Sequence, residues 1–311
     1  MTRLVRFGWF VIGWNVVTIL LGALVRATHS GAGCGRSWPT CQGELLPELS
    51  GATTIEFTHR IASGIALVLV AALVAVVWRS AGRGQPARRA ALWAGVAIVG
   101  EALIGAAIVF YEWVADDRSI ARVVAVPLHL VNTFLLLAAL TLTAWFLGGG
   151  GRLVARGGPF RWMLAGGAAL VAIAGTGAVT ALADTLFPSE SVASGLAAAI
   201  TSTEHFLTRL RVIHPAMAVL TVSAAAFATR LLRGPVLARV RTLLILSLMQ
   251  MGLGVLTIAL ASPLWVRLLH LATADLIWIS YVWLAAQTLS SKVDSDSGVS
   301  TGARQAKPVH R

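Results

Sequence analysis

Four of the seven histidines stand near the ends of long apolar stretches, at His59, His129, His214 and His270. Ionisable groups are costly inside a bilayer and are usually functional there. Neutral imidazole is the commonest protein ligand for metals and a standard axial ligand of haem iron. One such histidine could simply bond a backbone carbonyl at the membrane interface, but four at matching places favour ligation. We therefore expect two bis-histidine haem sites, formed by His59 with His129 and by His214 with His270.

The sequence contains two cysteines, Cys34 and Cys41, and both fall in the polar segment after the first apolar stretch. If this segment faces the oxidising side of the membrane, we expect a disulfide between them. In the chain-entropy model, closing so short a loop contributes about 2–3 kcal/mol. The bond could act as a staple or in redox chemistry, and Trp38 and Pro39 inside the loop indicate a stiff lid. Two cysteines exclude a multi-cysteine zinc or iron–sulfur site.

Glu56 precedes His59 by three residues, which places both on one face of a helix. A carboxylate there could stabilise the start of the helix through its dipole. It could also act as an acid, a base or a cation-stabilising group beside the edge of a haem. The equivalent place in the second half holds Arg211 and Val212, and that half has no cysteine. We therefore expect the first half to bind substrate and the second to hold a permanent haem that relays electrons.

Further ionisable residues lie in or beside the apolar stretches. We expect Glu101 and Asp275 to face the interior of the helices and to bond to neighbours, without a catalytic role. Arginines at the outer ends could pair with haem propionates or extend to the lipid headgroups. These arginines are Arg26, Arg60, Arg211 and Arg267.

The elements that must position these residues are membrane helices. The chain has 311 residues, 57% of them hydrophobic and 12% charged, with a mean hydropathy of +0.79. Soluble domains carry about 25% charged residues. A bilayer core about 30 Å thick needs about 20 apolar residues in a helix. The sequence offers eight such stretches, at about 8–28, 59–78, 90–111, 124–147, 162–182, 209–230, 241–261 and 267–288.

The net charge of +12 marks orientation. Of the 25 basic residues, 17 fall in the N-terminus, the even-numbered connections and the tail, with only two acidic residues among them. Basic loops stay on the cytoplasmic side, so we expect both termini there, in a multi-pass protein of a bacterial-type cell membrane. Nucleic-acid binding has little support, because the basic residues are explained by topology.

The two halves of the sequence resemble each other. His59 and His214, Glu101 and Gln250, and His129 and His270 recur at offsets of 155, 149 and 141 residues. We therefore predict an all-α membrane protein with eight transmembrane helices in two pseudo-symmetric four-helix bundles, residues 1–150 and 151–290. Residues 291–311 are predicted to form a disordered cytoplasmic tail.

Taken together, these features resemble the haem A synthase family. The resemblance covers about residues 8–288 and rests on the run 22–31, the Cys34 to Cys41 loop, the segment 56–60 and the three later histidines. It implies oxidation of the C8 methyl group of haem O to a formyl group, which gives haem A for cytochrome oxidase. It also implies contact with haem O synthase and cytochrome oxidase assembly factors, and it names no electron acceptor.

The resemblance also implies residue roles. His59 and His129 would hold the substrate haem, and His214 and His270 would hold haem b. Glu56 matches the family's essential carboxylate, and Cys34–Cys41 matches its outer-loop disulfide. On this hypothesis the methyl group is oxidised twice, through an alcohol and a hydrate. Glu56 would stabilise positive charge at the carbon or orient a water, and the haem would supply the redox chemistry.

The sequence departs from the family in two respects. Some members carry a second cysteine pair in the third outer loop, whereas residues 184–209 contain none here, so a disulfide relay through the second half is not required. His29 and Glu101 stand where a small residue and an amide are expected.

Two other functions also explain the four histidines. One is a di-haem electron carrier of the cytochrome b type, which leaves Glu56 and the cysteine loop without a purpose. The other is a haem carrier without catalytic activity.

Overall fold

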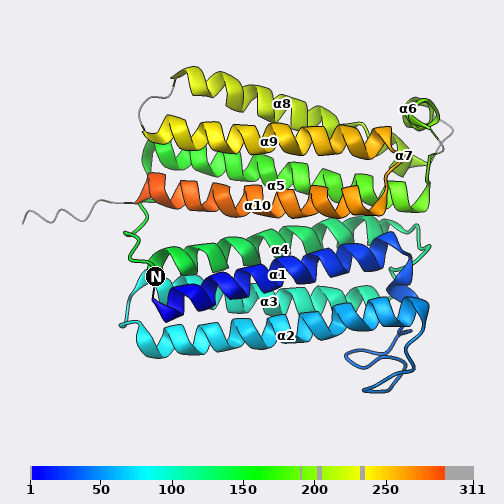
Figure 1. Cartoon of the computed structure of the whole chain (residues 1–311), viewed down its shortest axis with the longest axis horizontal. Helices are drawn as coiled ribbons and strands as arrows, with labels where there is room; N and C mark the ends of the chain where they lie inside the picture. The colour runs from blue at the N-terminus through cyan, green and yellow to red at the C-terminus, as the bar shows by residue number, and fades with distance from the viewer. Residues whose placement is uncertain (1, 190, 202–204, 232–234, 291–311) are drawn as a thin grey trace, which may run out of the picture.

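Long α-helices make up most of the chain. The computed structural model describes residues 2–189, 191–201, 205–231 and 235–290, and no β-strand occurs within them. The long helices lie side by side along one axis (Figure 1). They are α1 Arg3–Ala27, α2 Gly51–Ser80, α3 Pro86–Phe110, α4 Ile120–Leu147, α5 Gly157–Leu186, α8 Ile213–Ala228, α9 Pro235–Ala259 and α10 Leu264–Leu289; two short helices, α6 Val192–Ile200 and α7 Phe206–Leu210, lie between α5 and α8.

The prediction of eight membrane spans is confirmed, because eight helical segments of the described chain are long and apolar enough to cross a bilayer. Two details differ from the prediction. Helix α2 begins at Gly51, earlier than the apolar stretch at 59, and hydropathy does not detect its first turns because they are rich in threonine. The sixth span consists of α7 and α8, separated at Arg211 and Val212.

Local sequence explains several helix ends. The side chain of Thr2 accepts a hydrogen bond from the Val5 amide at 3.3 Å, and Ser119 accepts one from the Arg122 amide at 3.2 Å. Such caps satisfy amides that have no partner within the helix. Pro215 lies in the first turn of α8, where its missing N–H costs nothing. Its neighbour His214 is thereby fixed at the start of this helix.

Helices α1–α4 form one group and α5, α8, α9 and α10 form the other (Figure 1). Helix α10 packs against α4 and α1 and so joins the groups. The indole Nε1 of Trp278 donates to the Phe134 carbonyl at 2.7 Å, and the two rings stack at 5.1 Å. This arrangement is consistent with two four-helix bundles, which are connected along the chain by residues 148–156. The predicted tail, 291–311, lies outside the described residues.

Both the start of α1 and the end of α10 lie at one end of the helices (Figure 1). The segment between α1 and α2, which contains both cysteines, lies at the opposite end. We call that end the loop end of the molecule.

Candidate functional site

The second pair of predicted ligands, His214 on α8 and His270 on α10, is brought together. Their ring centroids are 6.3 Å apart and the ring planes meet at 79°. Two imidazole nitrogens that each lie about 2 Å from one metal place their ring centroids about 6 Å apart. The His214 Nδ1 lies 3.0 Å from the Ile173 carbonyl, so the Nδ1–H donates there and leaves Nε2 free to bind a metal.

Glycines on neighbouring helices make room for these rings. A Cβ atom on Gly177 would lie 2.9 Å from Cε1 of His214, and a Cβ on Gly22 would lie 2.9 Å from Cε1 of His59. Gly177 and His214 each lie 155 residues after their counterparts, Gly22 and His59. Our sequence reasoning missed this role for the glycines, although their spacing equals that of the histidines.

The first pair of predicted ligands is His59 on α2 and His129 on α4. The Nδ1 atom of His129 lies 2.7 Å from Oε2 of Glu101 on α3. The Nδ1 atoms of His59, His129 and His270 are buried and make no hydrogen bond within the described residues, so the contact of His129 with Glu101 is an ion-pair contact.

These donor sets fit haem. Each half contributes two imidazoles, and no group of three metal-ligating side chains occurs among the described residues. A haem iron needs only axial ligands from the protein, because the porphyrin fills its remaining positions. Gly22 and Gly177 leave space for the rings of His59 and His214. Buried ring nitrogens without a hydrogen-bond partner are also expected where a bound group holds the imidazoles.

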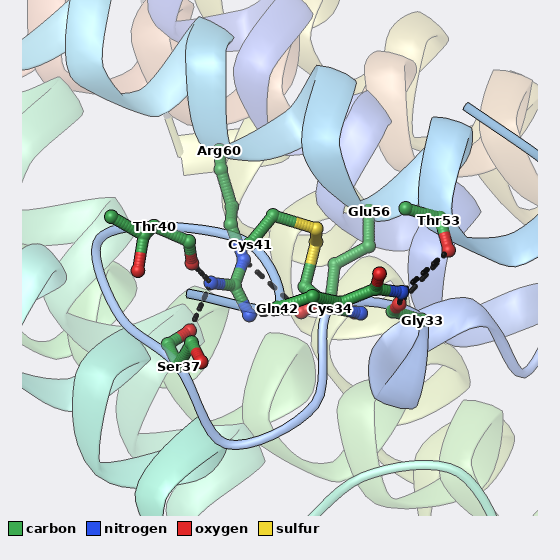
Figure 2. A network of polar contacts seen from close by, with 9 residues as sticks. All are labelled: Gly33, Cys34, Ser37, Thr40, Cys41, Gln42, Thr53, Glu56 and Arg60. Atoms are coloured by element: carbon green, nitrogen blue, oxygen red, sulfur yellow. Dashed lines mark hydrogen bonds and ion pairs between the residues drawn. A yellow bond between two sulfur atoms is a disulfide. The ribbon is translucent and has the colours of Figure 1, made fainter. Parts of the chain in front are cut away.

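Glu56 lies at the loop end of α2 and is tied to the cysteine loop (Figure 2). The residue is only 3% exposed, and its Oε2 accepts a hydrogen bond from the Cys34 amide at 2.8 Å. Its Oε1 accepts from Arg60, at 2.5 Å from Nη2 and 3.2 Å from Nε. Because α2 begins at Gly51, Glu56 is not in the first turn, and the helix-dipole explanation for it is wrong.

Arg60 connects this carboxylate to the loop. Its Nη1 donates to the carbonyls of Ser37 and Thr40, which lie between the two cysteines (Figure 2). The predicted disulfide between Cys34 and Cys41 is confirmed, and both residues are fully buried. Glu56, Arg60 and the disulfide loop thus form one network, which we call the loop network.

The four arginines considered as propionate partners differ in the contacts that they make in the structure. Arg60 is engaged in the loop network. Arg211 pairs with Asp184 at 3.0 Å and donates to two backbone carbonyls. Arg267 donates to Thr185 at 2.8 Å, whereas Arg26 has a buried Nη1 without a partner among the described residues. Arg26 is therefore the most suitable of the four to bind an added anionic group.

Three other sequence-predicted groups have different outcomes. Glu101 bonds to neighbours, as predicted, through Asn132 and Thr133. Asp275 is fully buried, but neither of its oxygens has a hydrogen-bond partner among the described residues, contrary to the expectation. His29, which had no predicted role, lies 3.2 Å from Asp116 at the loop end.

Comparison with known proteins identifies relatives over nearly the whole chain. The COX15-CtaA family model, described as cytochrome oxidase assembly protein, matches residues 5–282. A protohaem IX farnesyltransferase of Thermus thermophilus is 44% identical over 296 residues, which cover 93% of this chain and 49% of that protein. The chain therefore spans about half the length of this relative.

Shorter matches join the chain to proteins named haem A synthase. The protein of Lysinibacillus sphaericus is 37% identical over 107 residues, 33% of this chain and 35% of that protein. The protein of Bacillus licheniformis is 43% identical over 90 residues, 29% of this chain and 30% of that protein.

Proposed function

Because the chain belongs to the COX15-CtaA family of cytochrome oxidase assembly proteins, we propose that it oxidises the C8 methyl group of haem O to the formyl group of haem A. One observation carries this proposal. A buried carboxylate, Glu56, lies one helical turn from His59 and is held by the disulfide loop. The position of His214 in the other half has no such carboxylate three residues before it. An electron carrier with two similar haem sites gives no reason for this difference.

We assign the substrate haem to His59 and His129, and a resident haem b to His214 and His270. When bound, haem iron supplies the redox chemistry, and the protein supplies position and electric field. The Ile173 carbonyl fixes the tautomer of His214, and Glu101 faces the ring of His129. The glycine contacts hold two of the rings against neighbouring helices.

Glu56 acts at the substrate in this proposal. Hydrogen bonds from Arg60 and the Cys34 amide hold its carboxylate in a fixed direction. An ionised carboxylate has about four acceptor positions, and three donors occupy it here. The remaining position can accept a hydrogen bond from a water molecule and aim that water at the methyl carbon. A fixed negative charge in a low-dielectric site also stabilises positive charge that develops on this carbon.

The overall conversion of a methyl to a formyl group adds one oxygen atom and removes four electrons. An electron acceptor and an oxygen source are therefore needed besides this chain.

The test is to express the chain in membranes that contain haem O and a working respiratory chain, and then to identify the extracted haems. Haem A that depends on the chain supports the proposal. The variant Glu56→Gln should keep its bound haem and lose haem A production. Haem A made at the normal rate by this variant would show that Glu56 has no catalytic role.

Other outcomes favour other functions. Protohaem alone in the purified protein favours an electron carrier, and haem O that stays bound and unchanged favours a haem carrier. Formation of haem O from protohaem and farnesyl diphosphate would favour farnesyl transfer, the activity in the name of the Thermus relative.

We also propose that the loop end faces the outside of the cell and that both termini are cytoplasmic, in accordance with the distribution of basic residues. Single cysteines in place of exposed Leu46 and exposed Arg83 test this in a background without the native pair. A membrane-impermeant maleimide should label the first in intact cells and the second only after lysis. The reverse pattern would overturn the orientation.

A further inference from the structure

The two halves differ in the group that faces the second histidine of each pair. In the first half this group is the carboxylate of Glu101, whose Oε2 lies 2.7 Å from Nδ1 of His129. In the second half the matching residue is Gln250, whose Nε2 donates to the backbone carbonyl of His270 at 2.9 Å. The Nδ1 of His270 has no partner among the described residues. Of the four proposed ligands, His129 alone has a carboxylate at ion-pair distance in the described structure.

Glu101 is held firmly in this position. Its Oε1 accepts a hydrogen bond from Nδ2 of Asn132 at 2.7 Å. The hydroxyl of Thr133 lies between this oxygen, at 3.1 Å, and the His129 carbonyl, at 2.9 Å. Asn132 also donates to the Ala97 carbonyl at 2.8 Å. A Cβ on Gly100 would lie 3.0 Å from Oδ1 of Asn132, so glycine permits this close approach of α3 and α4. The carboxylate is therefore built into the helix contact.

The contact between His129 and Glu101 is close, but the ring N–H is turned away from a straight hydrogen bond to the carboxylate. When Nε2 of an imidazole binds a metal, Nδ1 carries the proton. A carboxylate this close to Nδ1 favours the tautomer that carries the proton there, and its charge makes the ring a stronger donor to the metal. A nearby negative charge in a medium of low dielectric also favours the more positive state of the metal. Both effects favour ferric over ferrous iron.

We propose that Glu101 is a positioning residue that acts through His129 to lower the reduction potential of the haem in the first half. Gln250 leaves the haem of the second half without this effect. The inference rests on the proposed haem sites and specifies how the two sites differ. It also gives a purpose to the carboxylate at a place where the family resemblance suggests an amide.

The test is a spectroelectrochemical titration of the purified protein with its haems bound. Glu101→Gln keeps the shape of the side chain and removes the charge. We expect it to change the ferric-to-ferrous equilibrium of one haem at least tenfold toward ferrous, which raises that midpoint by about 59 mV for one electron. The other midpoint and the haem content should not change. The exposed acid Glu48, replaced by glutamine, provides the matched control and should move neither midpoint.

A second variant predicts a shift of opposite sign. Thr133→Val removes the hydroxyl that lies between the Glu101 carboxylate and the His129 carbonyl. The carboxylate then has one fewer donor nearby to offset its negative charge, and the midpoint should fall. A purely structural role for Glu101 gives no reason for opposite shifts. The proposal is overturned if Glu101→Gln changes the equilibrium less than twofold, or, should that variant lose haem, if Thr133→Val leaves the midpoint in place. Absence of haem from the first half in the unsubstituted protein would instead refute the proposed function.

Discussion

Replacement of Arg60 by glutamine should open the disulfide loop. Its guanidinium binds the Glu56 carboxylate and the carbonyls of Ser37 and Thr40, and the side chains of Arg60 and Glu56 are only 9% and 4% exposed. Removing one partner from such a buried pair costs about 3–5 kcal/mol, because the other charge is left uncompensated. Part of this cost is relieved if the loop lifts and water reaches Glu56. The free energy of local opening should therefore fall by several kcal/mol.

Hydrogen exchange measured by mass spectrometry on residues 33–44 reports this opening. The Cys34 amide donates to Glu56 and the Gln42 amide donates to the Cys34 carbonyl, so both amides are protected only while the loop is closed. Each 1.4 kcal/mol is a factor of ten, so exchange should accelerate on the order of 100-fold or more in Arg60→Gln. Arg60→Lys keeps the charge but not the planar fork, and it should give an intermediate rate.

A double variant tests the coupling directly. When Glu56→Gln is added to Arg60→Gln, no uncompensated charge remains, so exchange should be slower than in Arg60→Gln alone. The reasoning is refuted if Arg60→Gln exchanges at the unsubstituted rate. It is also refuted if the two single effects simply add, because the network would then not act as a unit.

Three further predictions concern the haem cradle, the contact between the two helix groups and the disulfide. Gly177→Ala should displace His214 and lower the haem content per chain by one, whereas Gly175→Ala, where a Cβ meets open space, should not; a pyridine haemochrome assay measures both. Trp278→Phe removes the indole hydrogen bond to the Phe134 carbonyl, which lies within α4, and should lower the stability by about 0.5–1.5 kcal/mol in thermal unfolding; an unchanged melting temperature would contradict this. Cys41→Ser should destabilise the closed loop by about 2–3 kcal/mol and speed proteolysis within residues 35–50, and resistance equal to that of the oxidised protein would show that the other contacts suffice.

The membrane spans could be predicted from the sequence because the hydropathy of a segment depends only on the residues within that segment. Eight apolar stretches predicted eight spans, and two cysteines in one polar loop predicted their bond. The short helices α6 and α7 were not predicted, because neither is long enough to give a span signal. The extension of α2 to Gly51 was missed for a related reason, since its first turns are polar and lie at the loop end.

The contacts of the candidate site were harder to predict. The pairing of Glu56 with Arg60 follows from their four-residue spacing on a helix, yet the carbonyls that complete the network come from the path of the loop. A loop path depends on many weak backbone preferences and has no simple sequence signal. The glycine cradles depend on contacts between helices, although the shared 155-residue offset of Gly22 and His59 could have indicated them.

The differences between the halves locate the chemistry more sharply than their similarity does. The glycine–histidine contact of His59 recurs at His214, so this part of the scaffold is common to both halves. Glu56 and Glu101 have no acidic counterpart at Arg211 and Gln250, so carboxylates at these two positions are confined to the first half. Negative charge favours both a more oxidised metal and a developing cation. A reaction that withdraws electrons from a bound substrate is therefore expected in the first half. The single substitution Gln250→Glu, which puts a carboxylate at the matching position of the second half, should alter the reduction potential of the haem there without creating a second substrate site.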